Sequence, residues 1–550
     1  MRRAATPGAI PDRTMSTLQA ETIERTDTSR PFTADGLLRR RASQRPGVIA
    51  LSDPPNLEAL GFGPPKSLSY READTAVDAL ASFFIELGLE PGDTIAVQLP
   101  NLALSPLTLL ASWRAGLTVA ALPMLWRAHE IAKACEEVAP KALIGVSSFA
   151  GQNYAETLCA IAVSQISVRF VLGFGRGLPD GVASLDEAIA AGQNKRDRLM
   201  EAPPRVTPAM ITFTARAGAP LLPIVRREEE LLAQGAMTVL ALSLDTHDVI
   251  LNPYPLTGPL GLSLGLMPWL IGGGTLAQHH PFDYAPFIEQ LLETGATVTA
   301  APPAILAELA KDGVLRRPSC RLRRLGAVWS MPELAGPPPP PFYGATPLLF
   351  DVYPLGDLTS LVLRRETRAG PTSLPLGRIH LEDDGEAAVF LETKLARVRS
   401  GGGDLLLRGP LVPHGPAGPL ALDADGFVST GLRAETEAGD GTRLWLKRDP
   451  ELLHHGGFTL AGCELDQLYQ SFPGFLDAAC FVLPDPIVGD RIFAAIVPRP
   501  SEPVSLEALT RFLEERQVAP YKFPDKLLVV KQIPRDADGR LLREQILMQV

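Results

Sequence analysis

Cysteine is scarce in this sequence, and the spacing of the cysteines argues against a zinc site or a dithiol redox site. The five cysteines are scattered over 550 residues, and no two of them stand at the CxxC spacing of a zinc or redox motif. This pattern favours buried or free thiols in a reducing compartment over metal binding. The N-terminus also lacks the apolar core of a secretory signal, so we expect a cytoplasmic protein.

Long apolar runs and stripes of one charge are missing as well. The longest apolar stretches are interrupted by Gly, Pro and Ser, which makes them too short to span a membrane. The formal net charge is −10 without a sustained basic stripe, so nucleic acid is not expected as a partner. Residues 1–32 are polar and rich in Thr, and we expect a disordered tail there.

What is present is sufficient for a large globular core. Hydrophobic residues make up 46% of the chain and charged residues 21%, close to the values of an average soluble globular protein. Because 550 residues exceed one ordinary core, we expect at least two domains, one of them large.

Helical and extended patterns alternate through the first part of the chain. Apolar residues recur at helical spacing at Leu80, Phe83, Phe84 and Leu87, and the apolar, β-branched stretch 94–99 follows as a strand. The alternation continues to residue 147 and returns at 286–309. Strands that alternate with helices predict a parallel sheet with helices on its faces.

The later part of the chain has a different pattern. Residues 370–432 form short alternating runs with many glycines, which predicts an antiparallel sheet or a small barrel. The remainder combines apolar strands with a helix near 505–516, which predicts a compact α+β unit with its own core. The expected fold class is therefore α/β, with a large N-terminal domain of parallel-sheet subdomains, a small β-barrel-like region and a small α+β C-terminal domain.

Four segments match, in order, the blocks of a known enzyme family. They read SLSYREADTAVDALASFFIELGLEPGDTIAVQLPN, DADGFVSTG, GGFTLAGCELDQL and PYKFPDKLLVVKQIPRDADGRLLREQI. Over residues 35–545 the chain resembles the AMP-forming acyl-CoA synthetase superfamily, whose members adenylate a carboxylate with ATP and then usually form a CoA thioester. The resemblance implies an N-terminal domain over 33–447, a hinge near Lys447, and a small mobile C-terminal domain over 448–550 that swings between two half-reactions.

The family's phosphate loop has a poor counterpart here. In the family it reads like TSGTTGxPKG and holds the ATP phosphates, which requires glycines and inward-pointing N–H groups. In the matching stretch 214–223, Thr214 keeps a hydroxyl and Gly218 keeps the backbone freedom, and the resemblance assigns both to nucleotide binding. Leu222 replaces the lysine, two prolines remove donors, and Arg216 supplies a cation at a different place. We predict that most of the groups that would bind the ATP phosphates are missing from this stretch.

The adenosine and magnesium positions have partial counterparts. In the family's YGxTE segment an aromatic side chain stacks on adenine and a Glu helps to hold magnesium; here Tyr353 and Asp357 stand in those places. A hard cation accepts Asp as well as Glu. A packed tyrosine and a solvated aspartate form an equally weighted alternative. Leu432 replaces the aspartate that binds ribose, a loss of about 1.5–3 kcal/mol, or about tenfold to hundredfold in affinity.

Further family positions fall near or after the hinge. Arg448 matches an arginine of the nucleotide site, although it can equally pair with a neighbouring acid. Gly456 and Gly457 match the glycines beside the pantetheine of CoA, and turn geometry alone would also account for them. Arg540 takes the place of the catalytic lysine that bridges the carboxylate and the α-phosphate. Arginine keeps the positive charge, but on a planar guanidinium group with a longer side chain. We therefore expect adenylation of the acid to be slower.

The resemblance implies ATP, Mg²⁺ and CoA as cofactors and a carboxylic acid or acyl-CoA as the small-molecule partner, with fatty and aromatic acids both open. The weakened positions predict an acid–CoA ligase-like protein that is impaired in adenylation. Two alternatives stay open. One is a non-catalytic binding or scaffold protein, as a homodimer or paired with an active ligase. The other is an enzyme that reuses the acyl and CoA sites without ATP.

Overall fold

The structure is a computed structural model that describes most of the chain. The described residues are 33–192, 208–330, 347–365, 371–381, 388–399, 402–413, 420–437, 440–447, 449, 451–485, 488–500 and 504–548. The predicted tail at 1–32 and Arg448 lie outside these residues.

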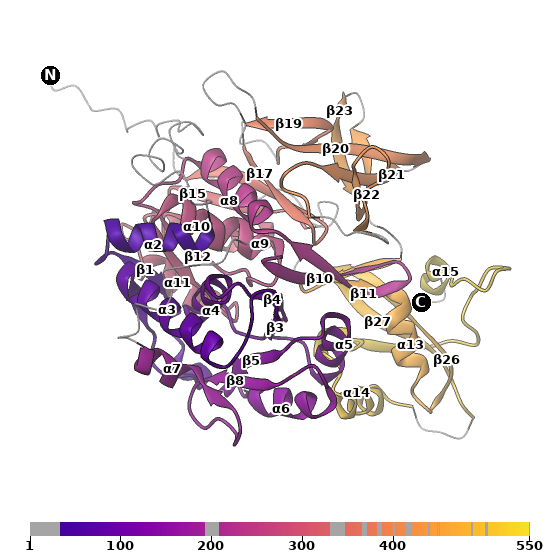
Figure 1. Ribbon diagram of the computed structural model, residues 1–550. Helices are drawn as coiled ribbons and strands as arrows, with labels where there is room; N and C mark the ends of the chain where they lie inside the picture. Colours follow the sequence, from indigo (N-terminus) through magenta and orange to yellow (C-terminus); the bar gives the residue numbers. More distant parts are fainter. Residues whose placement is uncertain are drawn as a thin grey trace.

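A first sheet of seven strands is built from alternating helices and strands (Figure 1). Its strands are β3 (Thr94–Val97), β4 (Thr118–Ala121), β5 (Ala142–Val146), β8 (Phe170–Phe174), β9 (Ala183–Ser184), β10 (Met210–Arg216) and β11 (Ala219–Arg226). They follow the order β11-β10-β4-β3-β5-β8-β9, and every neighbouring pair is parallel except β10 and β11. The strand predicted at 94–99 is β3. A small ribbon pairs β6 (Ser148–Phe149) with β7 (Gln152–Asn153).

A second sheet of eight strands completes the parallel part of the fold. Its strands are β1 (Ile49–Ser52), β2 (Ser67–Ser69), β12 (Val249–Asn252), β13 (Thr275–Gln278), β14 (Val298–Ala301), β15 (Arg324–Val328), β16 (Leu348–Leu355) and β17 (Thr359–Arg364). They follow the order β17-β16-β15-β14-β12-β13-β1-β2, and only the pairs at the two edges are antiparallel. The inner strands are almost entirely buried, as expected where helices cover both faces of a sheet.

Helices pack on the faces of these sheets. They are α2 (Ala34–Gln44), α3 (Tyr70–Glu86), α4 (Leu104–Arg114), α5 (Ala128–Val138), α6 (Tyr154–Ser164), α7 (Leu185–Gly192), α8 (Glu228–Leu242), α9 (Pro259–Gly261), α10 (Met267–Gly272), α11 (Tyr284–Glu293) and α12 (Pro303–Lys311), with a π-helical turn at Leu262–Leu266 and 3₁₀ turns at Glu58–Leu60 and Val314–Arg316. Local sequence sets their starts: Ser69 and Glu72 form a reciprocal capping box at α3.

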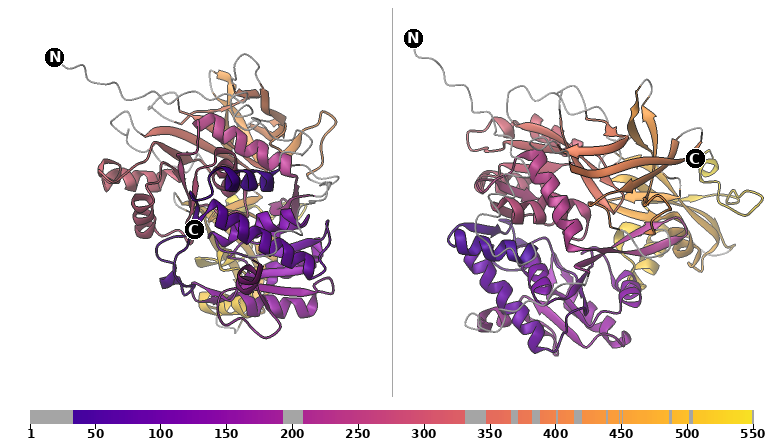
Figure 2. Two further views of the ribbon diagram at one scale, coloured as in Figure 1. Left: turned by 60° about the vertical axis from the view of Figure 1, so that its left-hand side comes forward. Right: turned by 45° about the horizontal axis from the view of Figure 1, so that its top comes forward.

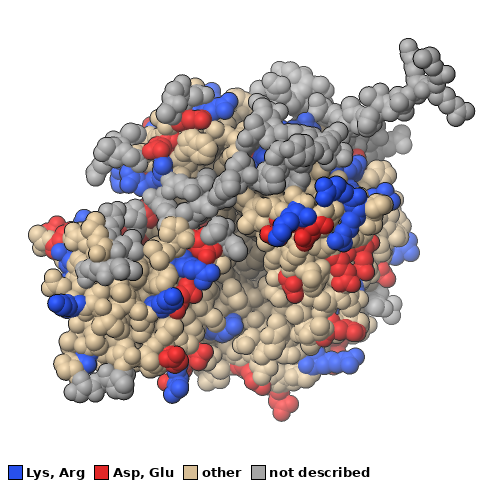
Figure 3. Space-filling model, turned by 180° about the vertical axis from the view of Figure 1, so that it is seen from behind, with Lys and Arg blue, Asp and Glu red and all other residues tan. Residues whose placement is uncertain are grey.

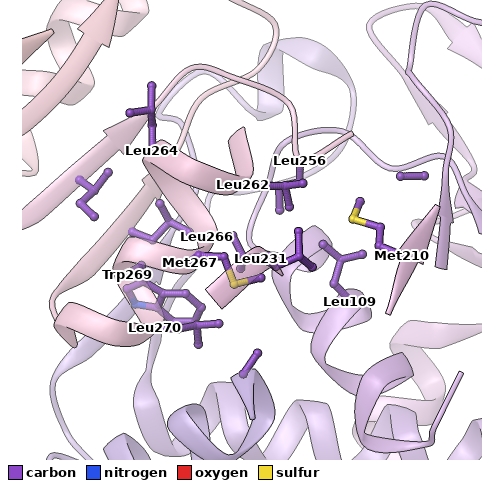
Figure 4. Packing of buried hydrophobic residues seen from close by; sticks show 14 of the residues in the cluster. Leu109, Met210, Leu231, Leu256, Leu262, Leu264, Leu266, Met267, Trp269 and Leu270 are labelled. Atoms are coloured by element: carbon purple, nitrogen blue, oxygen red, sulfur yellow. The ribbon is translucent and has the colours of Figure 1, made fainter. Parts of the chain in front are cut away.

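The main core lies between these helices and the sheets. Figure 4 shows Leu109 of α4, Met210 of β10 and Leu231 of α8 facing the side chains of the π-helical turn and α10. Trp269 of α10 is fully buried and stacks on Tyr70 of α3 with ring centroids 6.0 Å apart. Side chains far apart in the sequence therefore share one hydrophobic core, so the parallel part folds as a single large domain.

The later chain forms an antiparallel sheet and a separate α+β unit, as predicted. The antiparallel sheet contains β18 (Leu374–Pro375), β19 (Gly377–Leu381), β20 (Ala388–Arg399), β21 (Gly402–Arg408), β22 (Val428–Glu437) and β23 (Asp440–Lys447). The C-terminal unit contains β24 (Leu452–His455), β25 (Phe458–Ala461), α13 (Gly462–Gln470), β26 (Phe475–Asp485), β27 (Gly489–Pro498), α14 (Leu506–Glu515), a 3₁₀ turn (Pro520–Lys522), β28 (Lys526–Val529) and α15 (Arg543–Leu547). The expected α/β fold class is confirmed. The domain boundary near Lys447, which stays a prediction, falls at the end of β23.

Figure 2 shows the antiparallel sheet and the C-terminal unit on the same side of the parallel sheets. The face in Figure 3 carries Lys and Arg side chains beside Asp and Glu side chains. Within the described part of the chain, no helix combines the length and apolar character needed to cross a membrane. The region of interest lies where the β10–β11 hairpin meets the antiparallel sheet.

Candidate nucleotide site

The segment that matches the phosphate loop is a tight β-hairpin. Thr214 pairs with Leu222 and Arg216 pairs with Ala219, so only two residues are left for the turn. Gly218 occupies the second of these positions with a φ of 74°, a conformation that glycine adopts without strain. In a phosphate loop, main-chain N–H groups point toward the ligand. Here the main chain of β10 and β11 is hydrogen-bonded between the two paired strands.

The two prolines of the hairpin are accommodated by the sheet topology. Pro220 and Pro223 lie on β11, which is the outermost strand of the seven-stranded sheet. Proline cannot donate to a strand ladder, so it is tolerated at a sheet edge and not in the centre. The proline-rich sequence is therefore compatible with a strand here, and both prolines remove donors that a phosphate would need.

Arg216 fills the space beside the hairpin. Its side chain is buried, and its Nη1 donates to the hydroxyl of Thr214 at 2.9 Å and to the carbonyl of Ala215 at 2.8 Å. Its Nη2 reaches the carbonyl of Ser429 on β22 at 3.5 Å. A Cβ atom placed on Gly431 would lie 2.8 Å from the Nε of Arg216. The guanidinium group thus occupies the gap between β10 and the segment Ser429–Leu432.

Two of the predicted site residues meet next to Arg216. The hydroxyl of Thr214 donates a hydrogen bond of 2.6 Å to Oδ2 of Asp357. Burial lowers the pKa of Arg216, and the nearby carboxylates of Asp357 and Asp449 oppose that shift. Arg216 therefore stands as a positive charge close to the carboxylate that was predicted to hold magnesium.

A second buried arginine, Arg226, holds the same segment from behind. Its Nε donates to the hydroxyl of Thr212 at 2.9 Å, its Nη1 donates to the carbonyl of Leu358 at 2.7 Å, and its Nη2 donates to the carbonyl of Asp357. Burial lowers the pKa of Arg226 to about 10, against the opposing charges of Asp357 and Glu230. Arg226 is not among the site residues predicted from the sequence. The sequence feature that could have identified it is a charged side chain directly after the apolar stretch PLLPIV.

Tyr353 is packed in the core. It lies on β16 with 3% of its surface exposed, and its hydroxyl donates to the carbonyl of Thr372 at 2.7 Å. Burial and the charge of Asp351 raise the pKa of this hydroxyl. Leu432, at the ribose-binding position of the family, is also buried in the main core. For Tyr353 the geometry matches the alternative of a packed side chain.

The two predicted glycines are explained by a turn in the C-terminal unit. Gly456 and Gly457 have φ values of 58° and 86° and form the two-residue turn between β24 and β25, where His455 pairs with Phe458. Positive φ at both central residues is what a type I′ hairpin turn requires. The strand β25 lies beside β10. The glycines thus have a structural reason to be present whether or not CoA binds.

Arg540 lies on an exposed turn of the C-terminal unit. Its backbone N–H donates to the carboxylate of Asp536 at 2.8 Å. Across the described residues, no hydrogen bond or ion pair joins the side chain of Arg540 to Thr214, Arg216 or Asp357. The structure therefore brings Thr214 and Asp357 together and leaves Arg540 outside their contacts.

The residues present do not fit ATP with magnesium. Arg216 fills the gap beside the hairpin, and the hairpin offers Leu222 in place of a lysine. The assignment of magnesium to Asp357 stays a prediction.

Comparison with known proteins assigns a family to these two units. A family model described as AMP-binding enzyme matches residues 38–341, and a second, described as AMP-binding enzyme C-terminal domain, matches residues 464–540. The chain is 26% identical to a salicylyl-CoA synthase / salicylate adenylyltransferase from Streptomyces sp, over 87% of this chain and 88% of that protein. It is 27% identical to a salicyl-AMP ligase / salicyl-S-ArCP synthetase from Mycobacterium tuberculosis, over 94% and 91% of the two chains.

Solved structures share the fold. The amide bond synthetase McbA from Marinactinospora thermotolerans matches with a TM-score of 0.74 at 19% identity, covering 94% of this chain and 99% of the other. A likeness at this level of identity concerns the fold, so the chemistry has to be argued from the site.

Proposed function

Because the chain belongs to the AMP-binding enzyme family, we propose that it is an acid–CoA ligase-like protein in which adenylation of the acid is impaired. The observation that carries this proposal is the position of Arg216, which is buried against Thr214 and next to Gly431. A triphosphate would have to displace this side chain and then bind to a hairpin whose main chain is already paired. Both requirements cost free energy before any contact with the nucleotide is made.

The proposed acid is aromatic. The relatives described above are named for salicylate, and this favours an aromatic over a fatty carboxylic acid for the present chain. CoA is proposed as the acyl acceptor on the same grounds, since one of these relatives is named a CoA synthase. The predicted sites Thr214, Gly218, Tyr353, Asp357, Arg448, Gly456, Gly457 and Arg540 enter the proposal as the counterparts of functional positions in the family.

The test is ATP–pyrophosphate exchange over a panel of aromatic and fatty acids, with ATP binding measured by calorimetry. We expect exchange that saturates with the acid but is much slower than that of an active ligase, together with weak ATP binding at millimolar nucleotide. Robust exchange with any acid would refute the proposed impairment. An active aryl-acid ligase of the family, assayed with the same acids and the same nucleotide stock, is the positive control.

A second candidate is a non-catalytic binding protein that keeps the fold. It is favoured by the exposed position of Arg540, without a contact to Thr214 or Asp357. Calorimetry with the acids, CoA and an acyl-CoA separates the two candidates in the same experiment. Binding of an acid or acyl-CoA by a protein that shows no exchange supports the binding protein, and slow but saturable exchange supports the impaired ligase.

A further inference from the structure

The C-terminal unit rests on the first sheet at β25, which lies beside β10, and at the helix α5. In Figure 1, α5 lies beside α13 of the C-terminal unit. The contact also involves the 3₁₀ turn Pro520–Lys522, which precedes β28. Buried hydrophobic residues of both units form one continuous cluster there, in which Tyr521 stacks on Phe458 with ring centroids 4.2 Å apart. The contact thus has an apolar core of its own.

A buried ion cluster lies within this contact. The Nζ of Lys522 is 3.0 Å from Oε1 of Glu130 on α5 and 2.8 Å from Oε1 of Glu464 on α13. The three side chains are only 3–8% exposed. Burial lowers the pKa of the Lys522 ammonium, but the two carboxylates outweigh burial and the net shift is upward. The charged form of Lys522 is therefore the one that this contact stabilises.

Two hydrogen bonds donated by backbone N–H groups also cross between the units at this point. The N–H of Ala519 donates to the carboxylate of Glu130 at 3.1 Å, and the N–H of His129 donates to the carbonyl of Gln517 at 3.1 Å. Glu130 also accepts from the N–H of Arg127 and so caps α5. One carboxylate therefore serves the helix cap, the ammonium group and an amide of the other unit.

The cluster is divided unequally between the units. Lys522 and Glu464 belong to the C-terminal unit, whereas Glu130 belongs to the N-terminal one. A rotation of the C-terminal unit would separate the carboxylate of Glu130 from the ammonium group of Lys522 and from the backbone N–H of Ala519. The rotation would break these charge-assisted hydrogen bonds and expose the apolar cluster around Tyr521 to water.

We propose that Lys522, Glu130 and Glu464 form a lock that holds the C-terminal unit in this one orientation, so that both units move as one body. In this orientation Arg540 remains on the exposed turn outside the candidate nucleotide site. The proposal concerns the motion of the chain and does not depend on whether ATP binds. It applies equally to an impaired ligase and to a binding protein.

The test is hydrogen exchange of the full chain, without nucleotide, resolved to single amides. The amides of His129 and Ala519 donate across the contact, whereas Val518 and Lys522 donate within the C-terminal unit, to Leu513 and Ala519. The lock predicts that the first two exchange as slowly as the last two. Exchange of the His129 and Ala519 amides at the rate of freely exposed amides would overturn the proposal, because the unit would then swing freely.

The substitution Glu130→Gln sharpens the test. Loss of the charge-assisted bonds is expected to speed exchange at His129 and Ala519 by about tenfold or more, with little change at Val518. Glu230→Gln is the matched control, because Glu230 is a buried cap of α8 that accepts from the N–H of Arg227. Equal effects of the two substitutions on the Ala519 amide would also overturn the lock. If Glu130→Gln does not fold, the comparison of amides in the wild type still decides.

Discussion

Two buried cations, Arg216 at the candidate nucleotide site and Lys522 at the domain contact, show opposite kinds of environment. Arg216 donates to a hydroxyl and to carbonyls, and its Nε has no hydrogen-bond partner. Lys522 lies between two carboxylates. Burial lowers the pKa of Arg216, whereas for Lys522 the carboxylates outweigh burial and raise the pKa. One cation is poorly compensated and the other is fully paired.

The difference bears on what each region does. Arg216 is held by carbonyls and one shared hydroxyl, and its side chain fills the gap between β10 and the segment Ser429–Leu432. A cation between two carboxylates from different units joins those units, so Lys522 acts in the assembly of the chain.

The largest effect is expected for Lys522→Met. This substitution takes the shared ammonium group from the buried carboxylates of Glu130 and Glu464 and leaves Glu464 only Lys133, whose Nζ is 3.9 Å away. The cost should be about 3–5 kcal/mol of unfolding free energy. Arg216→Met should cost less, about 1–3 kcal/mol, because the carbonyl of Ala215 loses this donor while no buried charge is left unpaired, since Asp357 is half-buried and keeps the bond from Thr214. Chemical denaturation of both variants measures the difference, and equal losses would contradict the contrast.

A compensated variant serves as the control for Lys522→Met. Adding Glu130→Gln and Glu464→Gln removes the unpaired charges and should recover most of the lost stability, because a buried ion cluster contributes little beyond the charges it neutralises. If the triple variant is as unstable as Lys522→Met alone, then packing and not charge explains the loss.

A gain of ATP affinity is the next effect in size. Arg216→Gly combined with Leu222→Lys and Leu432→Asp removes the side chain that fills the gap beside β10 and restores two polar groups of the family pattern. Each charge-assisted hydrogen bond is worth about 1.5–3 kcal/mol, so the dissociation constant measured by calorimetry should fall at least about tenfold. Leu222→Lys with Leu432→Asp alone, while Arg216 is still present, should gain less. A folded triple variant without any gain would show that these positions do not face a nucleotide.

Most of the fold follows from sequence pattern, because it depends on periodicity and burial. The helix predicted from the apolar spacing at 80–87 and the strand at 94–99 correspond to α3 and β3, and the glycine-rich region after 370 is the antiparallel sheet. The stretch after β10 is the exception, since family spacing suggests a loop whereas the chain continues as a hairpin. Its prolines lie on an edge strand, and only the sheet order reveals that edge.

The candidate site is less predictable because its contacts join distant segments. The leucine at position 222, where the family resemblance predicts a lysine, is visible in the sequence, but the contact between Arg216 and Ser429 spans 213 residues. Lys522 and Glu130 are further apart still, and neither stands out in a charged surface pattern before folding. Long-range pairing of single charges leaves no periodic signal, which is why the lock appears only in three dimensions.

Tyr353→Phe separates a packed side chain from a ligand-binding one. The substitution removes the hydroxyl that donates to the carbonyl of Thr372, which should cost about 0.5–1.5 kcal/mol of stability. An aromatic ring that stacks on a base would keep its function without the hydroxyl, so nucleotide binding in the triple variant above should not change. Unchanged stability would mean that the hydroxyl bond contributes nothing to the core.

The smallest effect is expected from pH, at His129 beside the lock. Its Nε2 is buried without a hydrogen-bond partner. Burial, followed by Lys133 and Lys522, lowers the pKa of His129, whereas Glu130 and Glu464 oppose the shift. The docked state therefore disfavours protonated His129. The stability that neutral His129 provides is full above its ordinary pKa of 6.5 and is lost as the pH falls through the lowered value.

Denaturation midpoints at about pH 8 and about pH 5 measure this loss. His279 and His280 are also buried with lowered pKa values and shift stability in the same direction, so the wild type alone cannot isolate His129. The difference between the wild type and His129→Gln removes their contribution. The wild type should lose slightly more stability on acidification than the variant. If the wild type and His129→Gln lose the same stability between the two pH values, then protonation of His129 does not contribute to the loss. The stability of the domain contact would then come from Lys522 and the apolar cluster.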